Sequence, residues 1–232
     1  MAVIHNTTMT PGKLELLAAW LPGEPWYVGA EREPRLSKAG GFRLDDPQGE
    51  VGIEFMVVTD ESGDRPVSYH VPLTYRGAPL AGADGGLIGT SEHGVLGRRW
   101  VYDGAHDPVL VAQLLALLQG RAEPQAQSMT DTRDPSVTAC FAGPGFPADA
   151  RPTTVADGSQ GTRIVVEADA ASGVGTGSAR RLTIEVARVL RPDPQTSRAD
   201  VSPSGGHVTA GWRTPDGRAC RGRFAVLHDA ST

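Results

Sequence analysis

The stretch "VGIEFMVVTDESGDRPVSYHVPLTYRG", residues 51–77, decides the fold. Its first part has two alternating, largely apolar faces, formed by Ile53, Phe55 and Val57 against Glu54, Met56 and Val58. This alternation predicts a largely buried strand. Residues 61–66 predict a turn, and residues 67–77 predict a second strand. The apolar face of that second strand consists of Val67, Tyr69, Val71 and Leu73. Two strands joined by a short turn indicate an antiparallel meander.

The segments on either side of this stretch extend the meander. Residues 38–46 predict a preceding strand, which a turn at residues 47–49 joins to the first one. Pro72 cannot donate a backbone hydrogen bond, so its position inside the later strand predicts a sheet edge or a bulge. Residues 78–97 are rich in small residues and predict a loop, whereas residues 98–107 predict a short strand.

Two segments have the spacing and the terminal residues of helices. In residues 10–21, Thr10 is the expected N-cap and Pro11 the first helical residue, and a Pro-Gly pair ends the segment. Residues 107–120 predict a longer aliphatic helix, with Asp107 as its N-cap and a glycine at its end.

The second half of the chain is again rich in strand patterns. A polar stretch at residues 121–135 is a candidate boundary. The expected strands after it are residues 136–142, 162–170, 180–190, 207–214 and 218–228, and a further short strand is expected at residues 2–8. Residues 214–218, "TPDGR", predict a tight hairpin. The predicted fold class is therefore α+β, with mostly antiparallel strands and two main helices.

Composition limits the classes of function. The chain has 232 residues, of which 39% are hydrophobic and 21% charged, and this indicates a globular protein with a sizeable core. A net charge of −5 argues against nucleic acid as a partner. The sequence shows no signal peptide and no apolar run near ~20 residues, so no membrane partner and a cytoplasmic location are expected. Cys140 and Cys220 are expected to be buried thiols, with a single disulfide as the alternative.

Most motifs that carry chemistry are missing from the sequence. There is no phosphate-binding GxxxxGK[ST] loop, no CxxC or HExxH metal motif and no GxSxG nucleophile turn. The glycines of "SGVGTGSA", residues 172–179, lack the third fingerprint glycine and predict a flexible hairpin loop. We therefore predict no metal site, no catalytic residue and no cofactor.

Aromatic residues gather in "LAAWLPGEPWYVG", residues 17–29. Such a cluster can be a ligand platform, a core plug or a docking surface. Trp26 and Tyr27 are candidates for a binding surface, and the resemblance described below favours a packing hinge with one of these two rings exposed.

A second polar and aromatic cluster lies in "GRRWVYDGAHDP", residues 97–108. It adds Arg98, Arg99, Trp100, Tyr102, Asp103 and His106 to the candidate binding surface. Aromatic rings and guanidinium groups bind sugars or phosphates, but Trp100 and Tyr102 also have the spacing of side chains that face one core. His106 beside Asp107 is either a general base with its orienting carboxylate or the start of a capped helix. His70 is expected on the face of its strand opposite the apolar row.

Three stretches resemble a known family. They are "AAWLPGEPWYVGAEREP" at residues 18–34, "VSYHVPLTYR" at residues 67–76 and "YDGAHDPVLVAQLLALL" at residues 102–118. In this order and spacing they resemble the N-terminal cap domain of actinobacterial maltokinases. The resemblance implies a cap-like region over residues 1–122, followed by a strand-rich second subdomain over residues 123–232 that is similar to a kinase N-lobe.

The resemblance also exposes departures from a kinase. In that family a strand of the N-lobe carries an ATP-contacting lysine, and the similar context here, "TIEVA", places Glu185 at that position. A carboxylate there would repel nucleotide phosphates. The Asp and Asn residues of a kinase catalytic loop are not found before Thr232. The resemblance therefore implies relatedness to an accessory domain rather than kinase activity.

Three functions follow as hypotheses. The first is a non-catalytic cap-like protein that binds a carbohydrate, or a partner enzyme of glucan or trehalose metabolism. The second is a sugar-kinase-like or α-glucan-modifying activity completed by another chain, and only this one would need ATP and Mg²⁺. The third is a purely structural or oligomerising domain.

Overall fold

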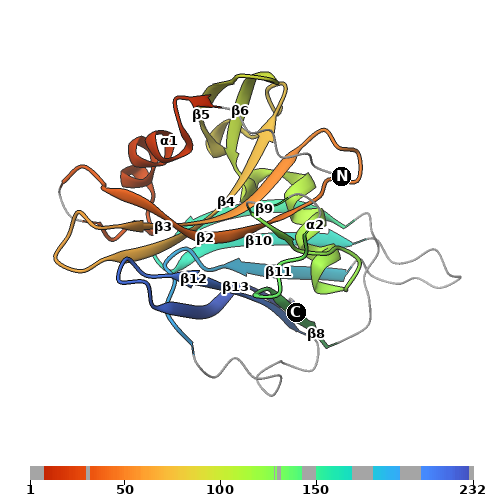
Figure 1. The fold of residues 1–232 in the computed structure, drawn as a ribbon. Coiled ribbons are helices and arrows are strands. Elements are labelled where there is room, and N and C mark those ends of the chain that lie inside the picture. Colours follow the sequence, from red (N-terminus) through yellow and green to blue (C-terminus); the bar gives the residue numbers. More distant parts are fainter. Residues whose placement is uncertain are drawn as a thin grey trace, which may run out of the picture.

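The structure is a computed structural model, and it describes residues 8–29, 32–127, 129, 132–142, 150–168, 180–193 and 205–229. The strand expected at residues 2–8 lies outside the described residues except for residue 8. The loop expected at residues 172–179 lies wholly outside them. The described strands form a single antiparallel sheet with the order β1-β5-β6-β4-β3-β2-β12-β13-β11-β10-β9 (Figure 1). Two short strands lie off this path, since β7 pairs with β2 and β8 pairs with β12.

The strands are β1 Met9–Thr10, β2 Leu36–Leu44, β3 Gly52–Asp60, β4 Val67–Arg76, β5 Leu87–His93, β6 Gly97–Asp103, β7 Gln125–Ala126, β8 Thr138–Phe141, β9 Arg151–Gly158, β10 Gly161–Ala168, β11 Arg180–Val186, β12 Gly206–Arg213 and β13 Ala219–Asp229. The α-helices are α1 Lys13–Trp20 and α2 Pro108–Leu118, and the 3-10 turns are η1 Leu21–Gly23, η2 Asp84–Gly86 and η3 Gly104–His106. The predicted α+β class, mostly antiparallel with two helices, is confirmed.

The predicted meander forms the centre of the sheet. β2, β3 and β4 pair antiparallel in sequence order, and Phe55 of β3 lies opposite Pro72 of β4. Nearly every residue of β3 is buried, as its two apolar faces predict. The prediction of an edge or a bulge at Pro72 is wrong, since β4 is not an edge strand and its register with β3 has no shift. Its outer side pairs with β6 only from Leu73 onward and with Val189 at Tyr69, so Pro72 falls between two partners.

Two further expectations at the N-terminal side need correction. Residues 87–93 form β5 rather than part of a loop, because they pair along β6 despite their small side chains. The first helix begins at Lys13, with Gly12 as its N-cap, whereas Thr10 belongs to β1. The Gly12 N–H donates to the Glu15 carboxylate at 2.6 Å. A side chain of the first turn therefore accepts a hydrogen bond from the backbone at the start of the helix.

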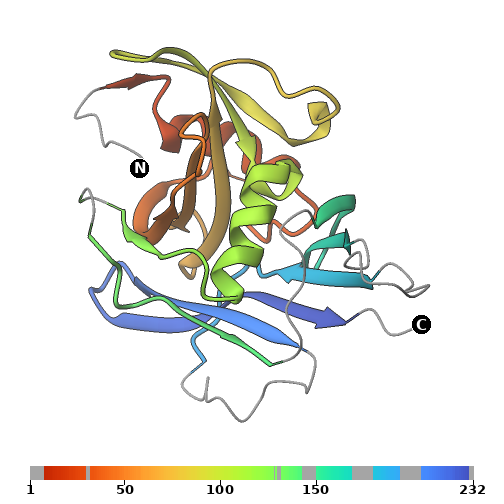
Figure 2. The same ribbon diagram turned by 90° about the vertical axis from the view of Figure 1, so that its right-hand side faces the viewer.

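The second helix agrees with its prediction. The Asp107 side chain accepts a hydrogen bond from the Val109 N–H at 2.9 Å, and Gly120 adopts a φ of 69° just after the helix. This capping role is one of the two that the His106-Asp107 pair allowed. Figure 2 shows α2 at the centre of the molecule, between β3–β4 and the C-terminal strands. No helix of the described part of the chain is long and apolar enough to cross a membrane.

A short segment after β11 closes the sheet on itself. The Leu190 N–H donates to the Ser68 carbonyl and the His70 N–H donates to the Arg188 carbonyl, both at 2.8 Å, while the Ala187 N–H donates to Phe224 of β13. Residues 187–190 therefore connect the C-terminal strands back to the outer edge of β4. The hydrogen-bonded path through β4, β3, β2, β12 and β13 becomes a ring.

β3 and β4 separate two hydrophobic cores. On one side, where Figure 1 shows α1, Trp26 and residues of α1 pack against Tyr69, Val71 and Leu73 of β4. On the other side α2 and the C-terminal strands enclose the larger core. His70 faces this larger core, opposite the apolar row as expected, and its ring centroid lies 4.4 Å from that of Phe224.

The two predicted halves share this larger core. It contains side chains from β2, β3 and α2 together with side chains from β10 to β13. The division at residues 122 and 123 stays a prediction. A strand that was not expected, β9, lies at one end of the sheet order and carries few large apolar side chains. Cys140 is partly buried, Cys220 is buried, and both are free thiols.

Candidate functional site

A cleft of about 850 Å³ opens beside the ends of β3 and β4. The loop between β2 and β3, the hairpin of β5 and β6, and the start of α1 form its walls. The functional side chains in it are Lys13, Arg43, Glu54, Tyr75, Arg99 and Gln127. Most of these elements come from the region before residue 122, and Gln127 reaches the cleft because β7 pairs with β2.

Glu54 is the centre of a hydrogen-bonded group that we call the Glu54 network, which consists of Glu54, Lys13, Tyr75 and Gln127. The Glu54 side chain is almost fully buried. Lys13 Nζ donates to Glu54 Oε2 at 2.5 Å and Tyr75 Oη donates to the same oxygen at 2.6 Å. Gln127 Nε2 donates to Oε1 at 2.6 Å. Both carboxylate oxygens are therefore held in fixed positions.

The pKa values of the two acidic groups in the network, Glu54 and Tyr75, both lie away from neutral pH. Burial alone would raise the pKa of Glu54, but the Lys13 ammonium and the Tyr75 hydroxyl outweigh it and hold this pKa below 4.5. Burial and the neighbouring Glu54 carboxylate raise the pKa of Tyr75 well above 10.0. Lys13 also lies 5.0 Å from the Tyr75 ring centroid, within cation–π distance. At neutral pH the network therefore consists of a buried, ionised carboxylate, an ammonium group and a phenol.

The arginines around the cleft have different environments. Arg76 makes a bidentate pair with Asp107, with bonds of 2.6 and 2.7 Å, and thereby ties β4 to the N-cap of α2. Arg43 donates to the Ala126 and Met129 carbonyls. Arg99 donates to the Leu96 carbonyl at the hairpin. These contacts position the walls of the cleft.

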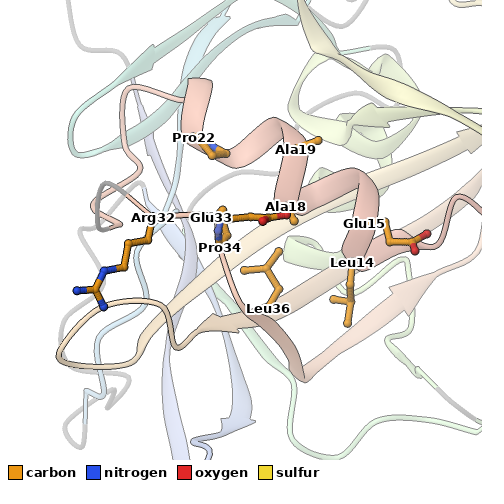
Figure 3. A pocket seen from close by; sticks show the side chains of 9 residues that line it. All are labelled: Leu14, Glu15, Ala18, Ala19, Pro22, Arg32, Glu33, Pro34 and Leu36. Carbon is orange, nitrogen blue, oxygen red and sulfur yellow. The ribbon is translucent and has the colours of Figure 1, made fainter.

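A second hollow, a shallow groove, lies along α1. Figure 3 shows Leu14 and Ala18 of the helix facing Pro34 and Leu36 across it, whereas the Arg32 guanidinium points away. The volume is about 690 Å³. Apolar side chains line most of this groove, and Figure 3 shows the Glu33 side chain directed across it toward Ala18. It has fewer polar groups than the cleft and therefore less capacity for specific recognition.

Trp26 does not belong to a binding surface, contrary to the sequence prediction. Its side chain is fully buried, with ring centroids 5.7 Å from Trp20 and 6.0 Å from Tyr69. The turn after α1 drives it into the smaller core, so it acts as a core plug. Tyr27 is partly buried, and its hydroxyl donates to the Asp60 carboxylate at 2.8 Å.

The predicted surface on β6 divides into separate environments. Arg98 is exposed and pairs with Glu92 at 2.8 Å, and Trp100 is partly buried. Tyr102 is buried, and its hydroxyl accepts a hydrogen bond from the Leu80 N–H. Arg99 lines the cleft, whereas Asp103 and His106 face the second half of the chain. The structure therefore does not bring the predicted residues together in one site.

Asp103 and His106 belong instead to what we call the Arg188 cluster, in which contacts join Asp103, His106, Asp157, Thr162 and Arg188. We include Glu24 because the charges of this group act on its carboxyl. The Arg188 side chain is fully buried, and its guanidinium lies 2.5 Å from Asp103 and 5.0 Å from the Trp26 ring centroid. Its Nε donates to Thr162 Oγ1 at 2.7 Å. His106 Nε2 lies 3.6 Å from Asp157.

Three groups of this cluster, Glu24, His106 and Asp157, have shifted pKa values. Burial, then Asp157 and Asp103, raise the pKa of Glu24 to about 7. The Asp157 carboxylate, 3.6 Å away, raises the pKa of His106 against the effect of burial. For Asp157, burial would raise the pKa, but His106, Thr162 and Arg188 lower it below 3.8. Burial and neighbouring carboxylates thus act on Glu24, whereas oppositely charged partners stabilise the charged forms of His106 and Asp157.

Glu185 lies away from both the cleft and the Arg188 cluster. It sits half-exposed on β11, 3.5 Å from Arg163 and 3.7 Å from His228. Across the described residues, His, Cys, Asp and Glu side chains do not gather in threes in a way that would hold a metal ion.

Sequence reasoning missed the centres of both polar groups. Glu54 and Arg188 are charged residues in or next to strongly apolar strand sequences, and this was the available signal. Lys13 is one of only two lysines, but its contact with Glu54 spans 41 residues of sequence. Spacing within a motif does not reveal such a pair.

The fold and the cleft define an α+β protein in which an antiparallel layer, covered on one side by a short helix, carries a polar ligand-sized cavity. Residues 20–107 match the family model of the maltokinase N-terminal cap domain. This part of the chain is therefore a maltokinase N-terminal cap-like region, as the three stretches of sequence predict. The match covers less than half of the chain. The comparison with curated proteins gave no match.

Proposed function

We propose that this protein is a non-catalytic accessory protein, related to maltokinases, that binds a carbohydrate in the cleft around Glu54. The cap-like region supports the link to α-glucan and trehalose metabolism. The observation that carries the proposal is the Glu54 network, which places a fixed carboxylate, an ammonium group, an amide and an aromatic ring in one cleft.

Sugar hydroxyl groups both donate and accept hydrogen bonds, so they fit a site of mixed charged and amide groups. Aromatic rings cover the apolar faces of pyranose rings. A volume of about 850 Å³ is within the range of small-molecule sites and suits a short oligosaccharide. Lys13 is 36% exposed at its side chain, so it remains accessible to a ligand while it pairs with Glu54.

The same network favours binding over catalysis. A general acid or base works best with a pKa near the operating pH. The pKa of Glu54 is lowered and that of Tyr75 is raised, so neither group exchanges a proton readily near neutral pH. The proposal includes a cytoplasmic location but no nucleotide and no Mg²⁺. A glucan- or trehalose-pathway enzyme as partner stays a prediction.

Calorimetric titration of the full chain with maltose, trehalose and glycogen tests this function. We expect binding of at least one of them, weakened about tenfold or more in Glu54→Gln because a charge-assisted hydrogen bond is lost. Glu185→Gln is the matched control, since the same exchange on β11 leaves the cleft intact. Lys13→Ala, at a half-exposed position, provides a second variant if Glu54→Gln unfolds. No heat with any of the three, or equal affinity in all variants, would contradict the proposal.

A further inference from the structure

The Arg188 cluster joins the cap-like region to the second half of the chain. Asp103 ends β6 and His106 lies in η3, whereas Asp157 belongs to β9 and Arg188 follows β11. Arg188 reaches Asp103 on one side and Thr162 on the other, and Asp157 Oδ1 lies 3.9 Å from its guanidinium. The contacts of this single guanidinium therefore span three separate strands.

The charges of the cluster do not balance without added protons. The charged and titratable groups that act on Glu24 are Asp157, Asp103, Arg188 and His106. With three ionised carboxylates and a neutral imidazole, the single guanidinium leaves an excess of two negative charges. The cluster becomes neutral when Glu24 and His106 each carry a proton. Such an excess of negative charge costs more free energy at a partly buried site than it does in water.

β9 carries Asp157, one of the charged groups of the cluster. It is the last strand in the sheet order and pairs only with β10 among the described strands. Most of its side chains are exposed or half-buried. The His106–Asp157 contact, at 3.6 Å, ties it to η3 in the cap-like region. Edge strands with little apolar burial open locally more readily than central strands.

We propose that the Arg188 cluster is a proton-dependent clasp, which holds β9 against η3 when Glu24 and His106 are protonated and releases it when they lose their protons. The pKa of Glu24 near 7 and the raised pKa of His106 place this change close to neutral pH. The cluster also holds unused hydrogen-bonding capacity, because Arg188 Nη1 is a buried donor without an acceptor in the described part of the chain. The clasp is independent of the carbohydrate cleft.

Hydrogen exchange of the full chain at pH 6 and pH 8, corrected for the intrinsic exchange rate at each pH, tests the clasp. We expect the protection of β9 amides to fall about tenfold between these pH values relative to β12 and β13. Glu24→Gln cannot ionise and should reduce this fall at least about threefold. Glu167→Gln, an exposed position on the neighbouring strand β10, is the matched control and should behave as the wild type. Equal protection of β9 at both pH values, or equal behaviour of Glu24→Gln and the wild type, would overturn the proposal.

A second variant separates the clasp from a general effect of charge. His106→Gln removes the cationic partner of Asp157, so β9 should exchange faster than in the wild type at pH 6. Between pH 6 and pH 8 its protection should then fall less than in the wild type, by the part that Glu24 contributes. Thermal unfolding of each variant at pH 6 checks that the rest of the fold is intact. Wild-type protection of β9 in His106→Gln at pH 6 would also overturn the proposal.

Discussion

The Lys13–Glu54 pair and the Arg188–Asp103 pair both place a buried carboxylate 2.5 Å from a cation, yet they differ in access. Lys13 is 36% exposed and lies in an open cleft, whereas Arg188 is completely enclosed. Water or a ligand can replace the first cation but not the second. The comparison indicates that burial of an acid alone does not distinguish a ligand site from a structural site, whereas the exposure of its partner does.

Removal of Arg188 should have the largest effect. Arg188→Met leaves Asp103 as an unpaired charge in the core and should lower the free energy of unfolding by about 3–5 kcal/mol. Urea denaturation at pH 7 measures this change. Arg163→Met is the matched control, because Arg163 has a half-exposed partner, and it should cost less than about 1 kcal/mol. Similar losses in the two variants would show that the enclosure of Arg188 has no special importance.

Removal of Lys13 should cost less. Lys13→Met exposes Glu54 to the cleft, where water can solvate it and where Tyr75 and Gln127 still donate hydrogen bonds. We expect a loss of about 1–2 kcal/mol in the same urea experiment, together with a rise in the pKa of Glu54. A loss as large as that of Arg188→Met would remove the distinction between the two pairs.

A third prediction depends on pH and concerns the titration of His70. Burial, and then the charge of Arg188, lower the pKa of His70 to about 3, while its bond to the Ala187 carbonyl opposes this shift. Because the native pKa lies below the unfolded value of 6.5, the native state binds fewer protons. Stability is therefore complete above pH 6.5 and is lost as the pH falls toward 3.

NMR titration of the His70 ring, with urea denaturation between pH 4 and 7, measures this dependence. In His70→Phe the slope of stability against pH should be smaller, since no proton can bind there. A native His70 that titrates near 6.5 would contradict the prediction.

Local sequence patterns were enough to predict the elements whose formation depends on the residues within them. The alternation in residues 51–77 predicted β3 and β4, and Asp107 and Gly120 predicted both ends of α2. β5 and β9 were missed because small and polar side chains give no such alternation, and pairing with β6 and β10 stabilises them instead. These partners are evident only in the folded chain.

The candidate site was less predictable than the fold. The residues next to Trp26 do not reveal whether its ring is exposed or buried. Only the packing of α1 on β4 shows that it is buried. Gln127 contacts Glu54 across 73 residues, through the pairing of β7 with β2. A sequence pattern reports spacing along the chain, and both observations depend on distance through space.

The closure of the ring by residues 187–190 has a consequence for synthesis of the protein. Until the ribosome has made these residues, Ser68 and His70 of β4 have no partners for their outer backbone groups. An unpaired strand edge invites pairing with other chains. The cap-like region is therefore synthesised with the outer edge of β4 partly unpaired. Contacts between residues distant in sequence must form before that edge is covered. Folds of this kind form slowly, so the interval between emergence and closure is when the chain is most exposed to aggregation.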